Sequence, residues 1–473
     1  MTAEAAQDAE LTAARPEDLP FIRETAERMR LDAGDLEAAQ FITVRRDGRV
    51  IGFGRVRPYR ETYELATVAV VEEEQGHGIG QAIARELVRR FPQDEVYVVT
   101  DQVEYWERLG FLRTEILPVE LATKRDEACA RFGRPDAVGM IYDRRIERLP
   151  GIADVYRAKH VLERQIPRTP LLRNPHISRQ MGCDLYIKYE NLMPIGAFKV
   201  RGGVYLASTL TDDEKRRGII GASTGNHGQS LAYGARLAAA RCIIAMPEEA
   251  NQLKVDSMRA LGAEVEFHGA NFEEARGWAE ETARREGLRY VHHVNAPELI
   301  TGVATLSLEV VEDLPDVDVI VTPIGGGSGA IGHLTIAKGI RPAVQVIGVQ
   351  AAGAPAVYNS WRDRKLQRGP IHTHAEGLAT GYAYFVPVKT FIDRMDDMLL
   401  VSEEEISAAV IMLARYAHQV AEDSGAAAMA AAVKLRERLA GKKVVVVLSG
   451  GNMTLDGLRR VLLENQEPEA SSQ

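Results

Sequence analysis

The stretch YENLMPIGAFKVRGG, from Tyr189 to Gly203, decides the fold that we predict for most of this chain. Lys199 lies within it, directly after the bulky Phe198 and between segments of small residues. Most lysines are solvated surface cations, but an apolar and tightly turned segment is expected to bury part of this one. Partial burial lowers the pKa of an ammonium group and supplies the neutral amine that a Schiff base requires. Lys199 is therefore the candidate catalytic amine.

Two motifs further along the chain complete a set of groups that a single cofactor requires. The turn GGGSG at residues 325–329 follows an apolar strand and precedes a helix. Backbone N–H groups at such a turn bind phosphate. Ser449 ends the apolar run VVVVL, which places its hydroxyl at the carboxyl edge of a sheet, where open α/β folds bind ligands. One amine, one phosphate cradle and one hydroxyl are the parts that hold pyridoxal phosphate.

A third turn, STGNH at residues 223–227, also lies between a strand pattern and a helix pattern. Its Asn226 is expected to reach the ring oxygen of the cofactor. The backbone N–H groups of the turn are expected to bind the carboxylate of a substrate. The residues predicted for this substrate contact are Ser223, Thr224, Gly225 and His227.

In this order, the motifs resemble those of fold-type II pyridoxal-phosphate enzymes, and most closely the threonine/serine dehydratase and serine racemase group. The resemblance covers about residues 150–460. It implies that Lys199 forms the Schiff base, that Asn226 bonds the phenolic oxygen and that Ser449 faces the pyridine nitrogen. The other cofactor-binding residues that it implies are Phe198, beside the ring, and Gly325, Gly326, Gly327 and Ser328 of the phosphate loop.

The same resemblance implies a lyase that acts on a β-hydroxy amino acid such as threonine, serine or a relative. Lys199 would remove the Cα proton, the β-hydroxyl would leave as water, and hydrolysis would give a 2-oxo acid and ammonia. A hydroxyl such as that of Ser449 does not stabilise a protonated pyridinium as a carboxylate does, which favours elimination over transamination. Glu376, in the turn at residues 374–379, is expected either to contact the substrate or to have a structural role.

Departures from the family pattern keep alternatives open. Thr224 stands where racemases of this group have a serine, so amino-acid racemisation remains an alternative, as does β-replacement on the same cofactor. Ala197 replaces the serine of the family's usual Ser-Phe-Lys. The segment at residues 348–354 lacks the carboxylate that binds a divalent metal in some relatives, so we predict no metal there. His292 and His293 would face opposite ways on a strand and are not expected to bind a metal either.

The first part of the chain carries a separate motif, QGHGIG at residues 75–80, between a strand pattern and a helix pattern. With its neighbouring segments it resembles the acetyl-CoA-binding core of GNAT-type N-acetyltransferases, over about residues 10–120. The resemblance implies acetyl-CoA or another acyl-CoA as the ligand. The residues expected to contact this ligand are Val68, Val70, Gln75, Gly76, Gly78 and Gly80.

The catalytic groups of this first part are less complete. Glu64 is the candidate base for acetyl transfer, acting through water, or else a solvated strand end. Trp106 stands where the family often has a tyrosine that acts as an acid, and Tyr105 beside it is expected to point elsewhere. The unit is therefore expected to transfer an acyl group, to sense acyl-CoA or to stabilise the chain.

Length and composition limit the partners and the compartment. The chain has 473 residues, 45% of them hydrophobic and 26% charged, as in globular proteins with a large core. Its net charge of −9 argues against nucleic acid and anionic membranes as partners. The three cysteines have no paired spacing, and the acidic first residues have no signal-peptide pattern. We therefore expect a cytoplasmic protein with no membrane segment.

The predicted fold class is α/β in two domains, because the alternation of strands and helices after residue 150 indicates mostly parallel sheets. Residues 1–148 form a GNAT-like mixed α+β domain, and the charged segment at residues 122–148 leads to its boundary. Residues 149–473 form the pyridoxal-phosphate lyase domain, with two parallel-sheet subdomains, the smaller at about residues 200–300. The resemblance implies a homodimer or homotetramer with an amino acid as its substrate.

Overall fold

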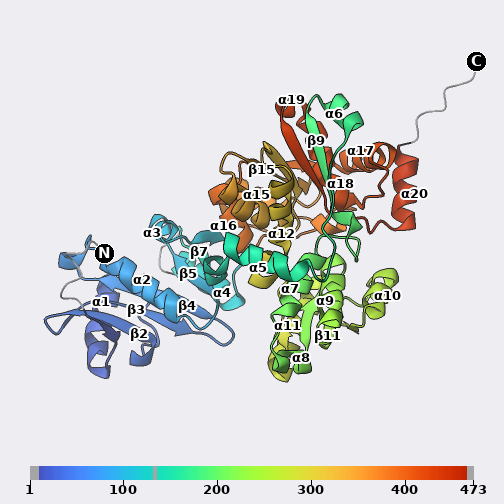
Figure 1. Ribbon diagram of the computed structural model, residues 1–473. Coiled ribbons are helices and arrows are strands. Elements are labelled where there is room, and N and C mark those ends of the chain that lie inside the picture. The colour runs from blue at the N-terminus through green and yellow to red at the C-terminus, as the bar shows by residue number, and fades with distance from the viewer. Residues whose placement is uncertain (1–9, 132–135, 466–473) are drawn as a thin grey trace, which may run out of the picture. The chain divides into compact units, whose positions relative to one another are not determined.

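The computed structural model describes residues 10–131 and 136–465. Most of the N-terminal segment on which the expectation of no signal peptide rested lies outside the described residues. The chain divides into two units, residues 1–147 with 364–366 and residues 148–363 with 367–473 (Figure 1). Over the described residues, no helix has the length and apolar character that a membrane crossing requires.

The N-terminal unit contains two four-stranded sheets. Its strands are β1 (Glu10–Ala13), β2 (Phe41–Arg46), β3 (Arg49–Pro58), β4 (Tyr63–Val70), β5 (Glu95–Thr100), β6 (Leu112–Thr114), β7 (Val138–Asp143) and β16 (Lys365–Leu366). One sheet has the order β1-β2-β3-β4 and is antiparallel throughout. The other has the order β16-β6-β7-β5, in which only the β16–β6 pair is parallel. Strands β4 and β5 therefore belong to different sheets.

Local sequence explains the β2–β3 hairpin and a distortion in β4. Asp47 and Gly48 have φ angles of 50° and 78°, the left-handed pair that a two-residue turn between twisted strands requires. In the β3–β4 ladder, Phe53 pairs with Ala69 but Arg55 pairs with Ala66, so β4 carries one extra residue. This bulge includes the left-handed Thr67 and turns the strand locally.

Helix α2 covers the first sheet with an apolar stripe. Its Ile79, Ile83 and Leu87 recur at helical spacing and are buried in one cluster with residues of β2, β3 and β4. The helices of this unit are α1 (Leu19–Arg28), α2 (Ile79–Arg90), α3 (Val103–Arg108) and α4 (Val119–Arg131), with the short turns η1 (Pro16–Asp18), η2 (Ala38–Gln40), η3 (Glu72–Glu74) and η4 (Arg144–Arg148).

The C-terminal unit has a larger and a smaller sheet. The strands of the larger sheet are β8 (Leu171–Arg173), β9 (Asp184–Tyr189), β14 (Val319–Pro323), β15 (Gln345–Ala351), β17 (Asp397–Val401) and β18 (Lys443–Leu448). They have the order β17-β15-β14-β18-β9-β8, and only β8 is antiparallel to its neighbour. The smaller sheet, entirely parallel, has the order β12-β11-β10-β13. Its strands are β10 (Ile219–Ala222), β11 (Cys242–Met246), β12 (Glu264–Phe267) and β13 (Arg289–Tyr290).

Helices lie on both faces of these sheets, and the predicted fold class, α/β with two parallel-sheet subdomains, is confirmed. The smaller sheet lies within the segment predicted for the smaller subdomain. The helices are α5 (Ile152–Leu162), α6 (Pro175–Met181), α7 (Val200–Ser208), α8 (Asp212–Arg217), α9 (Asn226–Leu237), α10 (Gln252–Ala260), α11 (Phe272–Glu286), α12 (Pro297–Asp313), α13 (Ser328–Gly332), α14 (Lys338–Ile340), α15 (Ala356–Asp363), α16 (Phe385–Arg394), α17 (Glu403–Met412), α18 (Asp423–Lys434), α19 (Arg436–Leu439) and α20 (Leu455–Glu464), with η5 (Glu190–Leu192), η6 (His333–Ala337), η7 (Glu376–Leu378) and η8 (Leu413–Ala417).

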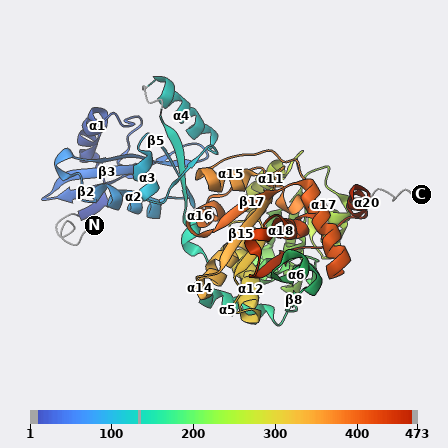
Figure 2. The same cartoon turned by 90° about the horizontal axis from the view of Figure 1, so that it is seen from above.

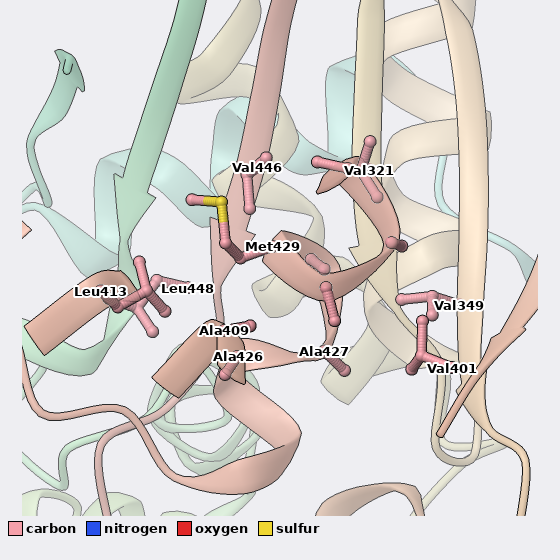
Figure 3. Close-up of a cluster of buried hydrophobic side chains, with 14 of the residues drawn as sticks. Val321, Val349, Val401, Ala409, Leu413, Ala426, Ala427, Met429, Val446 and Leu448 are labelled. Atoms are coloured by element: carbon pink, nitrogen blue, oxygen red, sulfur yellow. The ribbon is translucent and has the colours of Figure 1, made fainter. Parts of the chain in front are cut away.

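Each sheet of the C-terminal unit has its own apolar core. Figure 2 shows α18 beside β15 and β17 of the larger sheet, and α17 packs against α18. In Figure 3, Ala427 and Met429 of α18 lie among strand residues such as Val349 and Val446, and all four are fully buried. The smaller sheet has separate clusters, one with α9 and α10 and one with α11. The two subdomains therefore do not share one core.

One part of the sequence was assigned no element and proves to be structured. The charged segment at residues 122–148 contains most of α4 and the whole of β7. Strand β7 pairs with both β5 and β6, so it is an interior strand of its sheet. Its Met140 is fully buried. The strand is difficult to predict from the sequence because charged residues flank it, while its own apolar residues face the core.

Candidate functional site

Backbone hydrogen bonds hold the Lys199 segment at the end of β18. Phe198 N–H donates to the carbonyl oxygen of Ser449 at 3.0 Å, and Ala197 forms an isolated antiparallel bridge with Gly450. These bonds join two segments that are about 250 residues apart in the sequence. The predicted amine and the predicted strand-end hydroxyl are thereby placed in one site.

The Lys199 side chain is held near the glycine-rich turn. Its Nζ donates to Ser328 Oγ at 2.9 Å and lies 5.3 Å from the centroid of the Phe198 ring. Burial removes water from the ammonium group and lowers the pKa of Lys199 to about 8. A lysine with this pKa supplies a neutral amine in mildly alkaline solution, as Schiff-base formation requires.

The turn at residues 325–327 forms a cradle in which only glycine fits. A Cβ at Gly325 would lie 2.1 Å from the carbonyl oxygen of Gly377, well inside van der Waals contact. Gly327 has a φ of 107°, a conformation that L side chains rarely adopt. The turn joins β14 to α13, which begins at Ser328. The absence of side chains leaves backbone N–H groups accessible, so these residues fit the phosphate of the expected cofactor.

This close approach gives a prediction. Gly325→Ala is expected to displace the turn, to raise the apparent Kd for pyridoxal phosphate at least about tenfold and to lower the free energy of unfolding by about 1–3 kcal/mol. Gly277→Ala in α11 is the matched control, because its Cβ would meet no atom within 4 Å. Cofactor titration by absorbance and urea unfolding measure both variants. Unchanged cofactor affinity in Gly325→Ala would remove this turn from the binding site.

Asn226, expected at the phenolic oxygen of the cofactor, lies in a polar network. Its Nδ2 donates to Glu422 Oε1 at 2.8 Å, and its Oδ1 accepts from Asn452 Nδ2 at 2.7 Å. Burial raises the pKa of the Glu422 carboxyl to about 7, although the Asn226 amide opposes the shift. Glu422 and Asn452 had not been identified from the sequence. Glu422 stands in no recognisable motif, Asn452 follows Ser449 by three residues, and only the folded chain brings them to Asn226.

The turn at residues 223–227 has fewer free donors than expected. Ser223 N–H donates to the Ala245 carbonyl oxygen at 3.1 Å, and Gly225 N–H donates to Ser223 Oγ at 3.1 Å. These two N–H groups are thus engaged within the chain. Thr224 is exposed at the tip of the turn, and the contact of residues 223–227 with a substrate carboxylate stays a prediction.

Three histidines lie close together beside this turn. His227 Nε2 is buried, and no described residue accepts from it or donates to it. Burial and the charge of Lys199 hold the pKa of His227 well below its usual value and lower that of His293 to about 3. The expectation that His292 and His293 face opposite ways is wrong, because their rings stack at 4.9 Å. The reason is that β13 ends at Tyr290, so the strand alternation does not reach them.

The segment around Glu376 makes several contacts within the chain. Glu376 forms an ion pair with Lys254 of α10. The next residue, Gly377, donates its N–H to Ser424 Oγ at 3.1 Å and approaches Gly325. Among the described residues, no three His, Cys, Asp or Glu side chains are arranged to hold a metal ion. The absence of a metal at residues 348–354 stays a prediction.

A second candidate site lies in the N-terminal unit, where a cavity of about 1550 Å³ is lined by residues of both β4 and β5. The loop that leads into α2 also lines it, and Gly76 and Gly78 there have φ angles of 80° and 79°. The residues expected to contact an acyl-CoA all line this cavity: Val68, Val70, Gln75, Gly76, Gly78 and Gly80.

The structure contradicts the expectation for Tyr105 and excludes one of the two alternatives for Glu64. Tyr105 does not point elsewhere: it lines the cavity beside Gly80, and its hydroxyl has no hydrogen-bond partner among the described residues. Trp106 packs against Phe111 in the core. Glu64 is not a solvated strand end, because it is 1% exposed. It accepts from Tyr59 Oη at 2.9 Å and from Lys124 Nζ at 2.6 Å.

Comparisons with known proteins match both units of the chain. Residues 162–450 match the family model of pyridoxal-phosphate dependent enzymes, and residues 7–111 match that of the GNAT acetyltransferases. The L-threonine ammonia-lyase of Thermotoga maritima is 37% identical over 66% of this chain and 78% of its own length. The serine racemase of Dictyostelium discoideum is 31% identical over 66% and 97%. The structure of threonine deaminase isoform 2 from Solanum lycopersicum has a TM-score of 0.63 at 30% identity, covering 68% of this chain and 88% of that one.

Proposed function

Because the chain belongs to the family of pyridoxal-phosphate-dependent enzymes and carries a GNAT domain before it, we propose that its C-terminal unit is an ammonia-lyase. It eliminates the β-hydroxyl of an amino acid such as threonine or serine as water, and hydrolysis of the product takes up one water and gives a 2-oxo acid and ammonia. The observation that carries the proposal is the largely buried Lys199 amine, 2.9 Å from Ser328 Oγ beside the glycine cradle. Relatives named threonine ammonia-lyase and threonine deaminase support the substrate class.

The residues of the chain divide the work as follows. Lys199 holds the cofactor, the backbone of residues 325–328 binds its phosphate, Asn226 and Ser449 face the polar positions of its ring, and Phe198 lies beside it. Pyridoxal phosphate, when bound, withdraws electrons from the Cα of an amino acid. The Lys199 amine accepts the Cα proton, and its lowered pKa suits this transfer. Ser449 presents a hydroxyl and no carboxylate, which favours loss of the β-hydroxyl over transamination.

The test is 2-oxo acid release from a panel of amino acids. L-threonine and L-serine should give 2-oxo acid and equimolar ammonia, whereas L-alanine, which lacks a β-leaving group, should give neither. A colourimetric hydrazone assay follows the oxo acid, and a coupled assay follows the ammonia. Protein that binds the cofactor but releases no ammonia from any β-substituted amino acid would contradict the proposal.

A second activity on the same cofactor is racemisation. Thr224 is exposed in the turn beside the site, and it stands where racemases of this group have the serine that protonates Cα from the face opposite the lysine. A relative named serine racemase supports this alternative, and β-replacement stays open as well. Chiral chromatography of residual serine after partial turnover distinguishes racemisation from elimination alone.

We further propose that the N-terminal unit binds an acyl-CoA in its cavity. Backbone N–H groups at residues 76–80 and the start of the 12-residue helix α2 suit the pyrophosphate. The side chains of β4 that line the cavity suit the pantetheine arm. Isothermal titration with acetyl-CoA tests this, with Gly78→Val as the variant in which a branched side chain occupies a left-handed position.

Compartment and assembly are also proposals. Among the described residues, Cys183 and Cys242 are free thiols, which supports a reducing compartment such as the cytoplasm. The net charge of −9 supports the absence of nucleic-acid and anionic-membrane partners. The homodimer or homotetramer follows from the family resemblance, and sedimentation equilibrium measures it.

A further inference from the structure

One amine enters the cavity of the N-terminal unit from within the chain. Lys124, on α4, lines the cavity, and its Nζ lies 2.6 Å from Glu64 Oε2 and 2.7 Å from Asp32 Oδ2. Two carboxylates that converge on one ammonium form the site that a primary-amine substrate would require. Lys124 occupies that site in the structure.

The choice of residue at this position is unusual within the unit. Lys124 is the only lysine among residues 1–147, where every other ammonium or guanidinium side chain belongs to an arginine. An arginine would pair with the same carboxylates but cannot be deprotonated in proteins. A lysine can lose a proton and attack a carbonyl carbon. A purely structural ion pair does not require a cation that can lose its proton.

Asp32 does not depend on Lys124 for its counter-ion. Arg57 pairs with Asp32, and Arg55 Nη2 lies 3.3 Å from Asp32 Oδ1. Burial raises the pKa of Asp32, but Lys124, Arg57 and the Gly34 N–H outweigh it and lower the pKa to about 2. Asp32 therefore stays ionised and holds the Lys124 ammonium in place, while Glu64 contacts the same ammonium from β4.

Glu64 connects the amine to the path expected for the acyl group. It lies on β4, four residues before Val68, and both line the same cavity. Tyr59 Oη donates to the Glu64 oxygen that binds Lys124 and orients it. The amine and its base thus lie at one end of the surface along which a pantetheine arm is proposed to run.

We propose that Lys124 is an acetyl acceptor of this unit, so that acetyl-CoA bound in the cavity modifies the ε-amine of the same chain. This inference rests on the acyl-CoA binding proposed above. Nζ forms a C–N bond to the thioester carbonyl carbon, the C–S bond breaks, and coenzyme A leaves with the electron pair. The ammonium gives up two protons: one passes through Glu64 to solvent, and the other neutralises the departing thiolate. The products are an N-acetyl-lysine and free coenzyme A.

The modification changes the electrostatics of the cavity. Acetylation removes the ammonium from Glu64, a carboxylate that is 1% exposed, while Asp32 keeps two arginines. A buried carboxylate without its cation is costly, so α4 is expected to lose part of its attachment. Hydrogen exchange at the backbone of α4 should therefore increase after modification.

The experiment uses the full-length holoenzyme with acetyl-CoA, followed by proteolysis and tandem mass spectrometry. Acetyl groups should accumulate on Lys124 at a rate independent of protein concentration and well above that of exposed lysines in the C-terminal unit. Glu64→Gln should slow this labelling roughly 10²-fold or more, the usual size of a general-base contribution. Lys124→Arg should show no label in the N-terminal unit, and its circular dichroism should match the wild type.

Calorimetry with acetyl-CoA separates the possible failures. Binding without Lys124 labelling would overturn this inference and leave the acyl-CoA proposal intact, whereas no binding would overturn both. Labelling that matches the exposed lysines, or that persists in Glu64→Gln, would identify uncatalysed chemistry and overturn it too. If Lys124 only blocks an external acceptor, the wild type stays unlabelled and Lys124→Ala consumes acetyl-CoA faster with an added amine, which also contradicts the inference.

Discussion

Lys199→Met is expected to lose 2-oxo acid release by a factor of at least roughly 10³ and to lose the Schiff-base absorbance of the bound cofactor. Methionine keeps the length of the side chain and removes only the amine. Nothing else among the described residues places an amine within hydrogen-bond distance of Ser328 Oγ. Steady-state assays and a visible absorption spectrum measure the two losses.

The same variant should fold at least as well as the wild type, which separates catalysis from stability. In the wild-type apoprotein, burial lowers the pKa of Lys199 from 10.5 to about 8. Below pH 8 the ammonium is protonated in both states, so the folded state bears the full cost of burying it. Lys199→Met should therefore raise the free energy of unfolding there by about 1–3 kcal/mol.

The stability advantage of Lys199→Met over the wild type is expected to decrease as pH rises. Between about pH 8 and 10.5 the folded wild type loses the proton while the unfolded chain keeps it, so the advantage of the variant shrinks as pH rises. Above that window both states are neutral and the advantage disappears. Urea unfolding of both apoproteins at pH 7 and pH 10 measures the trend. An advantage that grows with pH would contradict the burial of a charged amine.

Arg201→Met is expected to lower the free energy of unfolding by about 3–5 kcal/mol. Arg201 is 1% exposed, and it pairs with Glu190 at 2.8 Å and with Glu309 at 2.7 Å. Lys188 provides the second buried cation, with its Nζ 2.5 Å from Glu309. The wild-type cluster is neutral, and the variant leaves one buried negative charge without a partner. Thermal and urea unfolding measure the loss.

A surface pair provides the matched control. Arg173 and Asp184 lie 2.6 Å apart, but their side chains are 46% and 44% exposed. Arg173→Met should therefore cost less than about 1 kcal/mol. Arg201 also lies in the first turn of α7, the helix that follows Lys199, so Arg201→Met should weaken cofactor binding and Arg173→Met should not. Equal losses of unfolding free energy in the two variants would show that burial does not determine how much the Arg201 cluster contributes to stability.

The sequence predicted those parts of the fold that depend on local patterns. Asp47-Gly48 predicted the β2–β3 hairpin, and the confirmed turn has both residues in left-handed conformations. The alternation of apolar strands and helices predicted the parallel sheets. Strand β7 was not predicted, because its six residues lie between two charged segments. Its pairing partners, β5 and β6, become evident only in the folded chain.

The candidate site could be predicted where each residue has a motif of its own. Lys199, Gly325–Ser328 and Ser449 each stand in such a motif, and the folded chain brings Lys199 to Ser328 and to the backbone of Ser449. Glu422 and Lys124 have no motif, because their partners lie 196 and 60 residues away along the chain. Such pairings are properties of the tertiary fold and leave no local trace in the sequence.

The separate cores of the two parallel sheets have a consequence for access to the lyase site. Several polar contacts cross the site between them: Asn226 donates to Glu422 and accepts from Asn452, and Lys254 pairs with Glu376. Opening the site would break contacts of this kind and leave each core intact, at a cost of about 1 kcal/mol net for each hydrogen bond. A substrate whose own polar groups replace these contacts recovers that cost, and one that cannot must bear it. Entry itself would then discriminate among amino acids before any bond is broken.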